Sequence, residues 1–196
     1  MRWDMKKSTV RATIILIVLI VGLVALYAFL MSRMKSDVPT AMTAVQSVLS
    51  RDLTKNYPAT VKEVVKYYTE IEKCLYNEEC TEEEIEALGM QARMLYDQEL
   101  LDNNEMAIYM TKLKEDVKSF KGAKQRIVFI VVASSTNVDY FSDDGYDFAR
   151  LYCGYTVKES KGRNVSEGRI YLLRRDEDRH WKIYGWDSDD NVQVGE

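Results

Sequence analysis

Residues 172–187, LLRRDEDRHWKIYGWD, predict two antiparallel β-strands joined by a charged turn. Apolar and polar residues alternate on both sides of the turn DEDR, and alternation is typical of a strand with one buried face. On this pattern Trp181 and Ile183 face the core, while His180 starts the opposite face beside the turn. A general base needs a positioned partner, which a hairpin end does not supply. We therefore interpret His180 as a surface residue and this stretch as the closing strand of a sheet.

The chain before this hairpin divides into a helical part and a strand-rich part. Helical spacing of apolar residues predicts four helices, at about residues 39–53, 60–75, 81–96 and 104–120. The pairs Thr60 with Glu63 and Thr81 with Glu84 have the spacing of capping boxes. Four strands are expected, at residues 126–135, 147–157, 168–175 and 180–187. This order predicts an α+β fold with about four helices packed on one face of a four-stranded antiparallel sheet.

Residues 12–31, ATIILIVLIVGLVALYAFLM, carry no charge and predict a transmembrane helix. Twenty residues at about 1.5 Å each span roughly 30 Å, the thickness of the hydrocarbon core of a bilayer. The run is longer than a signal-peptide core and no cleavage pattern follows it, so we expect an uncleaved anchor. The flanking charges favour a cytoplasmic N-terminus and an extracytoplasmic C-terminal domain, because four basic residues precede the span: Arg2, Lys6, Lys7 and Arg11.

The expected organisation has four parts. These are a basic head, the transmembrane helix, a juxtamembrane helix and an extracytoplasmic α+β domain, at residues 1–11, 12–31, 32–57 and 58–196. The net charge of the chain is −4, and the acidic excess lies after the span without clustering. An acidic surface argues against a nucleic-acid partner. The expected contacts are therefore the lipid bilayer, through residues 12–31, and a membrane or envelope protein or a second copy of the chain.

Three cysteines leave one question open. Cys74 and Cys80 flank the short segment LYNEE and could close a disulfide in an oxidising compartment, or remain two thiols. Cys153 lies in an apolar strand and is expected in the core. We expect no metal site, because there is no zinc-ligand pattern and the acids near residues 143–144 and 187–190 lack calcium-loop spacing. No nucleophile elbow, phosphate loop or dinucleotide fingerprint is present, so no cofactor and no catalytic residue is expected.

The element order and the final hairpin, Leu172 to Asp187, resemble the nuclear-transport-factor-two-like (SnoaL-like) superfamily. The whole chain also resembles uncharacterised single-pass membrane proteins of clostridial Gram-positive bacteria, with a basic head, one span, helices and then this sheet. The resemblance implies a cone in which helices lie in the concave side of a curved sheet. Enzymes of the superfamily place acid–base groups inside the cone, and spacing alone identifies no such set here.

Three functions follow as hypotheses. The first is a non-catalytic, membrane-anchored extracytoplasmic module for protein interaction or assembly. The second is a small-ligand receptor whose cone presents an aromatic pocket, with Tyr152, Tyr171, Trp181 and Tyr184 as candidate residues. The third is a SnoaL-like enzyme. An exposed apolar patch on the outer sheet face would favour assembly, whereas a deep apolar cavity would favour a ligand.

Overall fold

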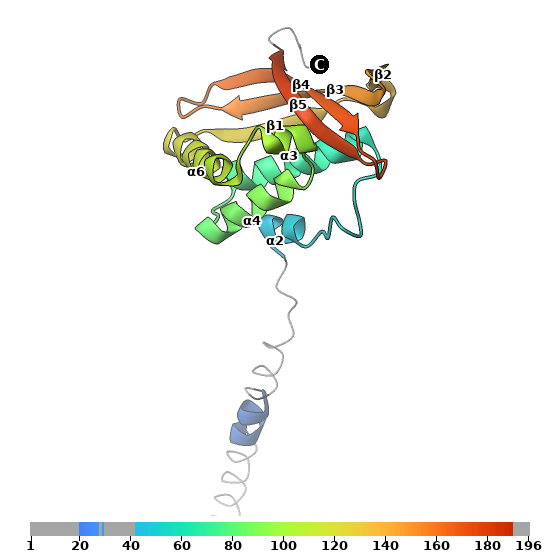
Figure 1. The fold of residues 1–196 in the computed structure, drawn as a ribbon. Helices are drawn as coiled ribbons and strands as arrows, with labels where there is room; N and C mark the ends of the chain where they lie inside the picture. Colours follow the sequence, from blue (N-terminus) through green and yellow to red (C-terminus); the bar gives the residue numbers. More distant parts are fainter. Residues whose placement is uncertain (1–19, 28, 30–41, 190–196) are drawn as a thin grey trace, which may run out of the picture. The chain divides into compact units, whose positions relative to one another are not determined.

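The computed structural model describes residues 20–27, 29 and 42–189 (Figure 1). The chain separates into two units, Met1–Ala41 and Met42–Glu196. In the first unit residues 20–27 and 29 are helical and their side chains are exposed. The rest of the predicted span, residues 12–19, 28, 30 and 31, lies outside the described residues. Among the residues that are described, no helix combines the length and the apolar character needed to cross a bilayer.

The second unit begins with five helices, and the polar residues at their starts explain where they begin. They are α2 (Ala44–Leu49), α3 (Val61–Asn77), α4 (Glu82–Arg93), α5 (Gln98–Asp102) and α6 (Met106–Gly122). Thr60 caps α3 and Thr81 caps α4, as predicted, and Thr81 and Glu84 form a complete capping box. The helix expected from residue 39 is shorter, because Thr43 caps α2 one residue before Ala44. The short helix α5, capped by Asp97, was not predicted.

The strands are β1 (Arg126–Val132), β2 (Asp139–Asp143), β3 (Tyr146–Lys158), β4 (Asn164–Arg175) and β5 (Trp181–Asp189). The four predicted strands are confirmed as an antiparallel sheet in chain order, β1-β3-β4-β5. The expected strand number was too low, because β2 pairs with the first half of β3. Asp144 and Gly145 join β2 to β3 with φ angles of 47° and 81°. Two successive positive φ angles make the tight hairpin turn that Asp-Gly favours.

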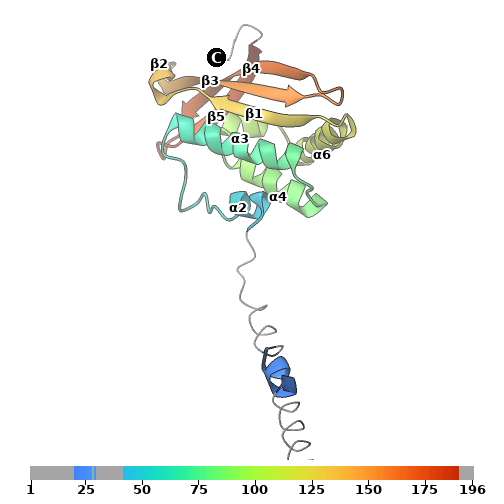
Figure 2. The same cartoon turned by 180° about the vertical axis from the view of Figure 1, so that it is seen from behind.

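All the larger helices cover one face of the sheet, so the fold is α+β (Figures 1 and 2). Helix α3 runs beneath β1 and α6 lies beside it (Figure 2). Two irregularities interrupt the ladder, one in β1 at Val128 and one in β5 at Tyr184, where each strand has a residue without a paired partner. An extra residue of this kind bends and twists the strand that carries it, so both bulges curve the sheet.

The core lies between the helices and the inner face of the sheet. Strand β3 contributes Ala149, Leu151, Cys153 and Tyr155, as its alternation predicts, and all four are buried. Trp181 and Ile183 are also buried, with exposed fractions of 8% and 0%. The prediction that the final strand closes the core is therefore confirmed. Helix α2 belongs to this core through Val45 and Val48.

Hydrogen bonds from outside the sheet reach backbone groups on both of its edges. On the β5 edge, Ile183 N donates to Leu95 O and Asp97 N donates to Ile183 O, both at 2.8 Å. On the β1 edge, the side-chain amide of Asn77 donates to Ile127 O at 2.8 Å and accepts from Ile127 N at 2.9 Å. Both contacts join the helical layer to a strand that would otherwise present unpaired backbone groups there.

Candidate functional site

A groove runs between the helices and β4, and we call it the α3–β4 groove. It consists of two adjoining cavities of about 400 and 420 Å³. The two cavities share five lining residues, which come from α3, α6 and β4: Glu72, Tyr76, Asp116, Glu167 and Arg169. Volumes of this size lie within the range of small-ligand sites.

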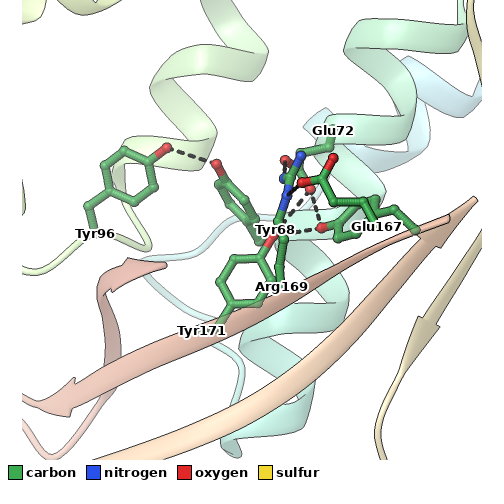
Figure 3. A network of polar contacts seen from close by, with 7 residues as sticks. Tyr68, Glu72, Tyr96, Glu167, Arg169 and Tyr171 are labelled. Carbon is green, nitrogen blue, oxygen red and sulfur yellow. Dashed lines mark hydrogen bonds and ion pairs between the residues drawn. The ribbon is translucent and has the colours of Figure 1, made fainter. Parts of the chain in front are cut away.

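Figure 3 shows an ion pair between Glu72 of α3 and Arg169 of β4, two residues that line both cavities. Arg169 Nη1 donates to Glu72 Oε1 at 2.8 Å, and Arg169 Nε donates to Glu167 Oε1 at 3.1 Å. The Glu72 side chain is 10% exposed and that of Arg169 is 25% exposed. The Arg169 guanidinium also lies over the ring of Tyr155, 4.3 Å from its centroid. Arg169 is therefore held by two carboxylates and one aromatic face.

Two tyrosine hydroxyls complete the network around Glu72. Tyr155 donates to Glu72 Oε2 at 2.5 Å, and the hydroxyls of Tyr155 and Tyr171 are 2.6 Å apart. A hydroxyl has one proton to donate. Because Tyr155 gives its proton to Glu72, Tyr171 is the donor in the contact between the two tyrosines. The result is a directed chain from Tyr171 through Tyr155 to the carboxylate.

Burial dominates the electrostatics of this network. It raises the pKa of Glu72 above its usual value, although Arg169 and the hydrogen bond from Tyr155 act in the opposite direction. Burial, followed by the charge of Glu72, also raises the pKa of Tyr155 well above its usual value. For Arg169 burial is the largest single effect and acts to lower the pKa, but Glu72, the two tyrosines and Glu167 together outweigh it, so the pKa is raised. Glu72 therefore becomes protonated at a higher pH than an ordinary glutamate does.

Aromatic side chains line both ends of the groove. The first cavity has Tyr76, Phe120 and Tyr155, and the rings of Tyr76 and Phe120 lie 4.8 Å apart. The second cavity has Tyr68, Tyr96, Tyr109 and Trp186 around it. Tyr68 and Tyr96 share a hydrogen bond of 3.1 Å between their hydroxyls. Trp186, which is 43% exposed, lies 5.9 Å from the Tyr68 ring and forms the rim of this cavity.

Both oxygens of Glu72 make contacts within the protein. Arg169 occupies one oxygen of Glu72 and Tyr155 occupies the other. A general acid or base needs hydrogen-bond access to the reacting group. Cys153, close to the network, has a pKa raised to about 12 by burial, so its thiol stays protonated. Within the part of the chain that the structure describes, no group of three or more His, Cys, Asp or Glu residues could hold a metal ion.

The four aromatic residues expected to form a pocket lie apart. Tyr171 is fully buried and Trp181 is 8% exposed, both on the inner face of the sheet. Tyr152 is exposed on the outer face, opposite Ile170. Tyr184 lies near the β5 edge, where its hydroxyl donates to Glu99 at 2.9 Å. Strand alternation separates Tyr152 from Tyr171, so a shared pocket is not formed by these four side chains.

The remaining sequence candidates also have defined places. Cys74 and Cys80 are free thiols, and Cys80 Sγ donates to Cys74 O at 3.4 Å. Pairing of these two cysteines in an oxidising compartment stays a prediction. The His180 ring packs against Tyr57 at an interplanar angle of 37°, with ring centroids 4.5 Å apart, and its Nδ1 lies 3.7 Å from Asp176. Its side chain is 43% exposed, consistent with a place at the hairpin end.

Sequence reasoning missed the charged pair in the groove, although the sequence contains a signal for it. Glu72 falls on the apolar stripe of α3, four residues after Tyr68 and three before Leu75. Arg169 has the same strand parity as Tyr171 and Leu173, which face the core. A charged residue on a buried face is informative, because charges are buried only when they are paired. Two opposite charges at such positions indicate an ion pair between helix and sheet.

The fold and the groove define the class of this protein as an α+β domain with helices on one face of a curved antiparallel sheet and an aromatic, charged groove between the layers. The chain belongs to the family described as a domain of unknown function, DUF6715, whose profile matches residues 1–186. The match includes the basic head, the apolar run and almost all of the second unit. A search of curated proteins finds no match to this sequence.

Proposed function

We propose that this protein is a membrane-anchored, extracytoplasmic module that associates with other copies of itself through the outer face of its sheet. The observation that carries the proposal is a group of apolar side chains on the face opposite the helices. Phe129 is 63% exposed, Val131 is 50% exposed and Tyr152 is 40% exposed. Ile170 and Leu172 are half-buried on the same face, by their pairing with outward residues of β3. We call these five residues the outer-face patch.

A second copy suits this patch because the patch is uncharged. In a twofold-symmetric contact each surface meets its own image, so a charged centre would repel itself. Arg150, the nearest cation by register, opposite Leu172, is paired with Asp139 at 3.4 Å. Val131 is paired with Gly154, and Gly154 with Gly168, so the centre of the face has little side-chain bulk. Two such faces can approach closely, as sheets do when they pack face to face.

Membrane anchoring supports the proposed self-association because it raises the local concentration of the protein. We propose that residues 12–31 cross the bilayer as a single helix, with the basic head in the cytoplasm and the second unit outside. Tethering many copies to one membrane raises their effective concentration, which strengthens weak contacts. We propose further that the bent sheet and its helices form a SnoaL-like cone, as in single-pass proteins of clostridial bacteria. The two bulges and the one-sided helical layer support this assignment.

The oligomeric state of the full chain in detergent micelles tests the proposal. Val131→Arg places a charge in the outer-face patch, and we expect it to convert the oligomer to a monomer in light scattering. Ile108→Arg on α6 is the matched control, because Ile108 is 52% exposed, close to the value for Val131, but lies in the helical layer. A monomeric wild-type chain, or equal loss in both variants, would contradict the proposal.

Protease accessibility tests the orientation separately. Protease added to intact protoplasts should digest the second unit, whereas digestion only after lysis would place that unit in the cytoplasm. This result does not depend on the oligomeric state. The two parts of the proposal can therefore fail independently.

A small-ligand receptor is the second candidate function, and the α3–β4 groove favours it. Its volume and its aromatic lining suit a small ligand. We rank this function second because the groove is more open and more charged than the deep apolar cavity that would favour a ligand most. A SnoaL-like enzyme is the third candidate. We rank it last because Glu72, the buried carboxylate of the groove, has both oxygens occupied by Arg169 and Tyr155.

A further inference from the structure

We infer that the first cavity of the α3–β4 groove binds a small organic cation, an amine or quaternary ammonium group attached to an apolar body. The inference rests on the second candidate function, the ligand receptor, and names the chemistry of its ligand. It does not depend on the outer-face patch. The argument comes from the charge balance of the cavity, from its aromatic lining and from the way its arginine is used.

The charged residues that line the first cavity are mostly acidic. Four carboxylates face one cation there: Glu72, Asp116, Glu159 and Glu167 face Arg169. Glu159 is paired outside the cavity, since Arg163 Nε lies 3.1 Å from its carboxylate. Arg169 is shared between Glu72 and Glu167. Pairing within the protein therefore leaves an excess of negative charge at this end of the groove.

Asp116 supplies the unpaired carboxylate. It projects from α6, lines both cavities and is exposed. Among the described residues it has no hydrogen-bond or ion-pair partner for its side chain. Lys112, one turn earlier on α6, lines only the second cavity. The first cavity therefore combines charges that are already paired, those of Glu72, Glu167 and Arg169, with the unpaired carboxylate of Asp116.

The aromatic lining suits an organic cation rather than a hydrated inorganic one. Tyr76 and Phe120, whose ring centroids lie 4.8 Å apart, line this cavity together with Tyr155. The negative face of an aromatic ring attracts cations, and the attraction grows when water is excluded. The protein already uses this interaction, because the Arg169 guanidinium lies over the Tyr155 ring. Carboxylates with aromatic rings recognise an ammonium group, while the apolar body of the ligand packs against Phe120 and Ile127.

An anionic ligand fits the same observations poorly. Arg169 is the cation in the first cavity, and Glu72 and Glu167 already neutralise it. An incoming anion would have to displace a carboxylate and would meet Asp116. The charge balance therefore selects cations over anions of equal shape.

Calorimetric titration of the full chain in detergent with three matched probes tests the inference. The probes are phenethylammonium, neutral 2-phenylethanol and phenylacetate, which share one ring and differ in charge. We expect the ammonium to bind with a Kd of about 1 mM or tighter, consistent with about nine non-hydrogen atoms. The alcohol should bind about fivefold to tenfold more weakly, and the anion should not bind.

Two variants locate the site. Asp116→Asn should weaken binding of the ammonium about fivefold and leave the alcohol unchanged. Its matched control is Glu115→Gln, because Glu115 is the exposed neighbour on α6 and lines neither cavity. Phe120→Leu, which keeps an apolar side chain but removes the ring, should weaken the ammonium more than the alcohol.

The outcomes separate the inference from the functions proposed above. Equal affinities for the ammonium and the alcohol would be compatible with a ligand receptor but would overturn the inference that its ligand is a cation. Tighter binding of phenylacetate, no saturable binding of the ammonium, or an equal effect of Glu115→Gln would overturn the site itself. Val131→Arg should leave every one of these titrations unchanged, because the outer-face patch lies on the other side of the sheet.

Discussion

Replacing Arg169 by methionine should destabilise the second unit strongly. The change removes the positive charge that neutralises Glu72, and Glu72 as a whole residue is only 7% exposed. The methionine side chain keeps an apolar contact with Tyr155. Removing one member of a buried ion pair costs about 3–5 kcal/mol, because the other charge stays buried without a partner. Protonation of Glu72 limits this cost, so we expect about 3 kcal/mol of lost stability at neutral pH.

The dependence of this loss on pH has a definite sign. Burial already raises the pKa of Glu72 in the folded protein, and removing Arg169 raises it further. A carboxyl group whose folded pKa is raised contributes stability below its unfolded pKa, and that contribution is lost as the pH rises through the folded pKa. The free energy of unfolding of Arg169→Met should therefore increase from pH 8 to pH 5. The wild type should show the same trend, relative to Glu72→Gln, with a smaller amplitude.

Urea unfolding of the fragment that begins at Met42, followed by circular dichroism at pH 5 and pH 8, measures both effects. Arg163→Met is the matched control, because Arg163 also pairs with a glutamate, Glu159, but its side chain is 73% exposed. Exposed pairs contribute little to stability, so the unfolding midpoint of this variant should stay near that of the wild type. Equal losses in the two arginine variants, or a larger loss for Arg169→Met at pH 5 than at pH 8, would refute the reasoning.

Three other predictions concern the core and the cysteines. Trp181→Ala should lower the free energy of unfolding in urea by about 3–5 kcal/mol, because the ring is buried. His180→Ala should change it by less than about 0.5 kcal/mol. A larger loss for His180→Ala than for Trp181→Ala would contradict the interpretation of His180 as a surface residue. Gly89→Ala should destabilise the fragment by about 1 kcal/mol, because a Cβ there would lie 2.7 Å from Leu113 Cδ2. The higher helix propensity of alanine offsets only part of this steric cost. Increased stability would mean that α4 and α6 separate easily. Iodoacetamide should modify Cys80 before Cys74 and Cys153 in the reduced folded chain, because burial raises the pKa of Cys74 to about 11 and that of Cys153 to about 12. Fast labelling of Cys153 would contradict its burial. Non-reducing mass analysis of membrane extracts checks whether Cys74 and Cys80 form a disulfide.

The sequence predicts the layers of the fold because periodicity reports which face of an element is buried. Alternation in residues 147–157 placed Ala149 and Leu151 correctly in the core, and the Thr caps placed the starts of α3 and α4. The same alternation could have separated Tyr152 from Tyr171. Grouping residues by aromatic character alone led to a pocket that the structure does not form.

The site was harder to predict than the fold because it joins positions far apart in the chain. Glu72 and Arg169 are 97 residues apart, and only the packing of α3 on β4 brings them together. Periodicity gives the face on which each residue lies but does not give the partner across the interface. Strand β2 was missed for a different reason: its residues are almost all exposed, so they show no alternation between a buried and an exposed face.

The contacts at the two sheet edges have a consequence for aggregation. Exposed strand edges can template the addition of strands from neighbouring molecules, which leads to irreversible aggregation. Asn77 blocks such growth at Ile127, and the backbone of Leu95 and Asp97 blocks it at Ile183. Each obstacle comes from the helical layer, so an edge becomes available there only if helix and strand separate. Partial unfolding of the helices would therefore expose the strand edges and promote aggregation. A substitution that removes the Asn77 side-chain amide should increase fibril formation before it abolishes folding.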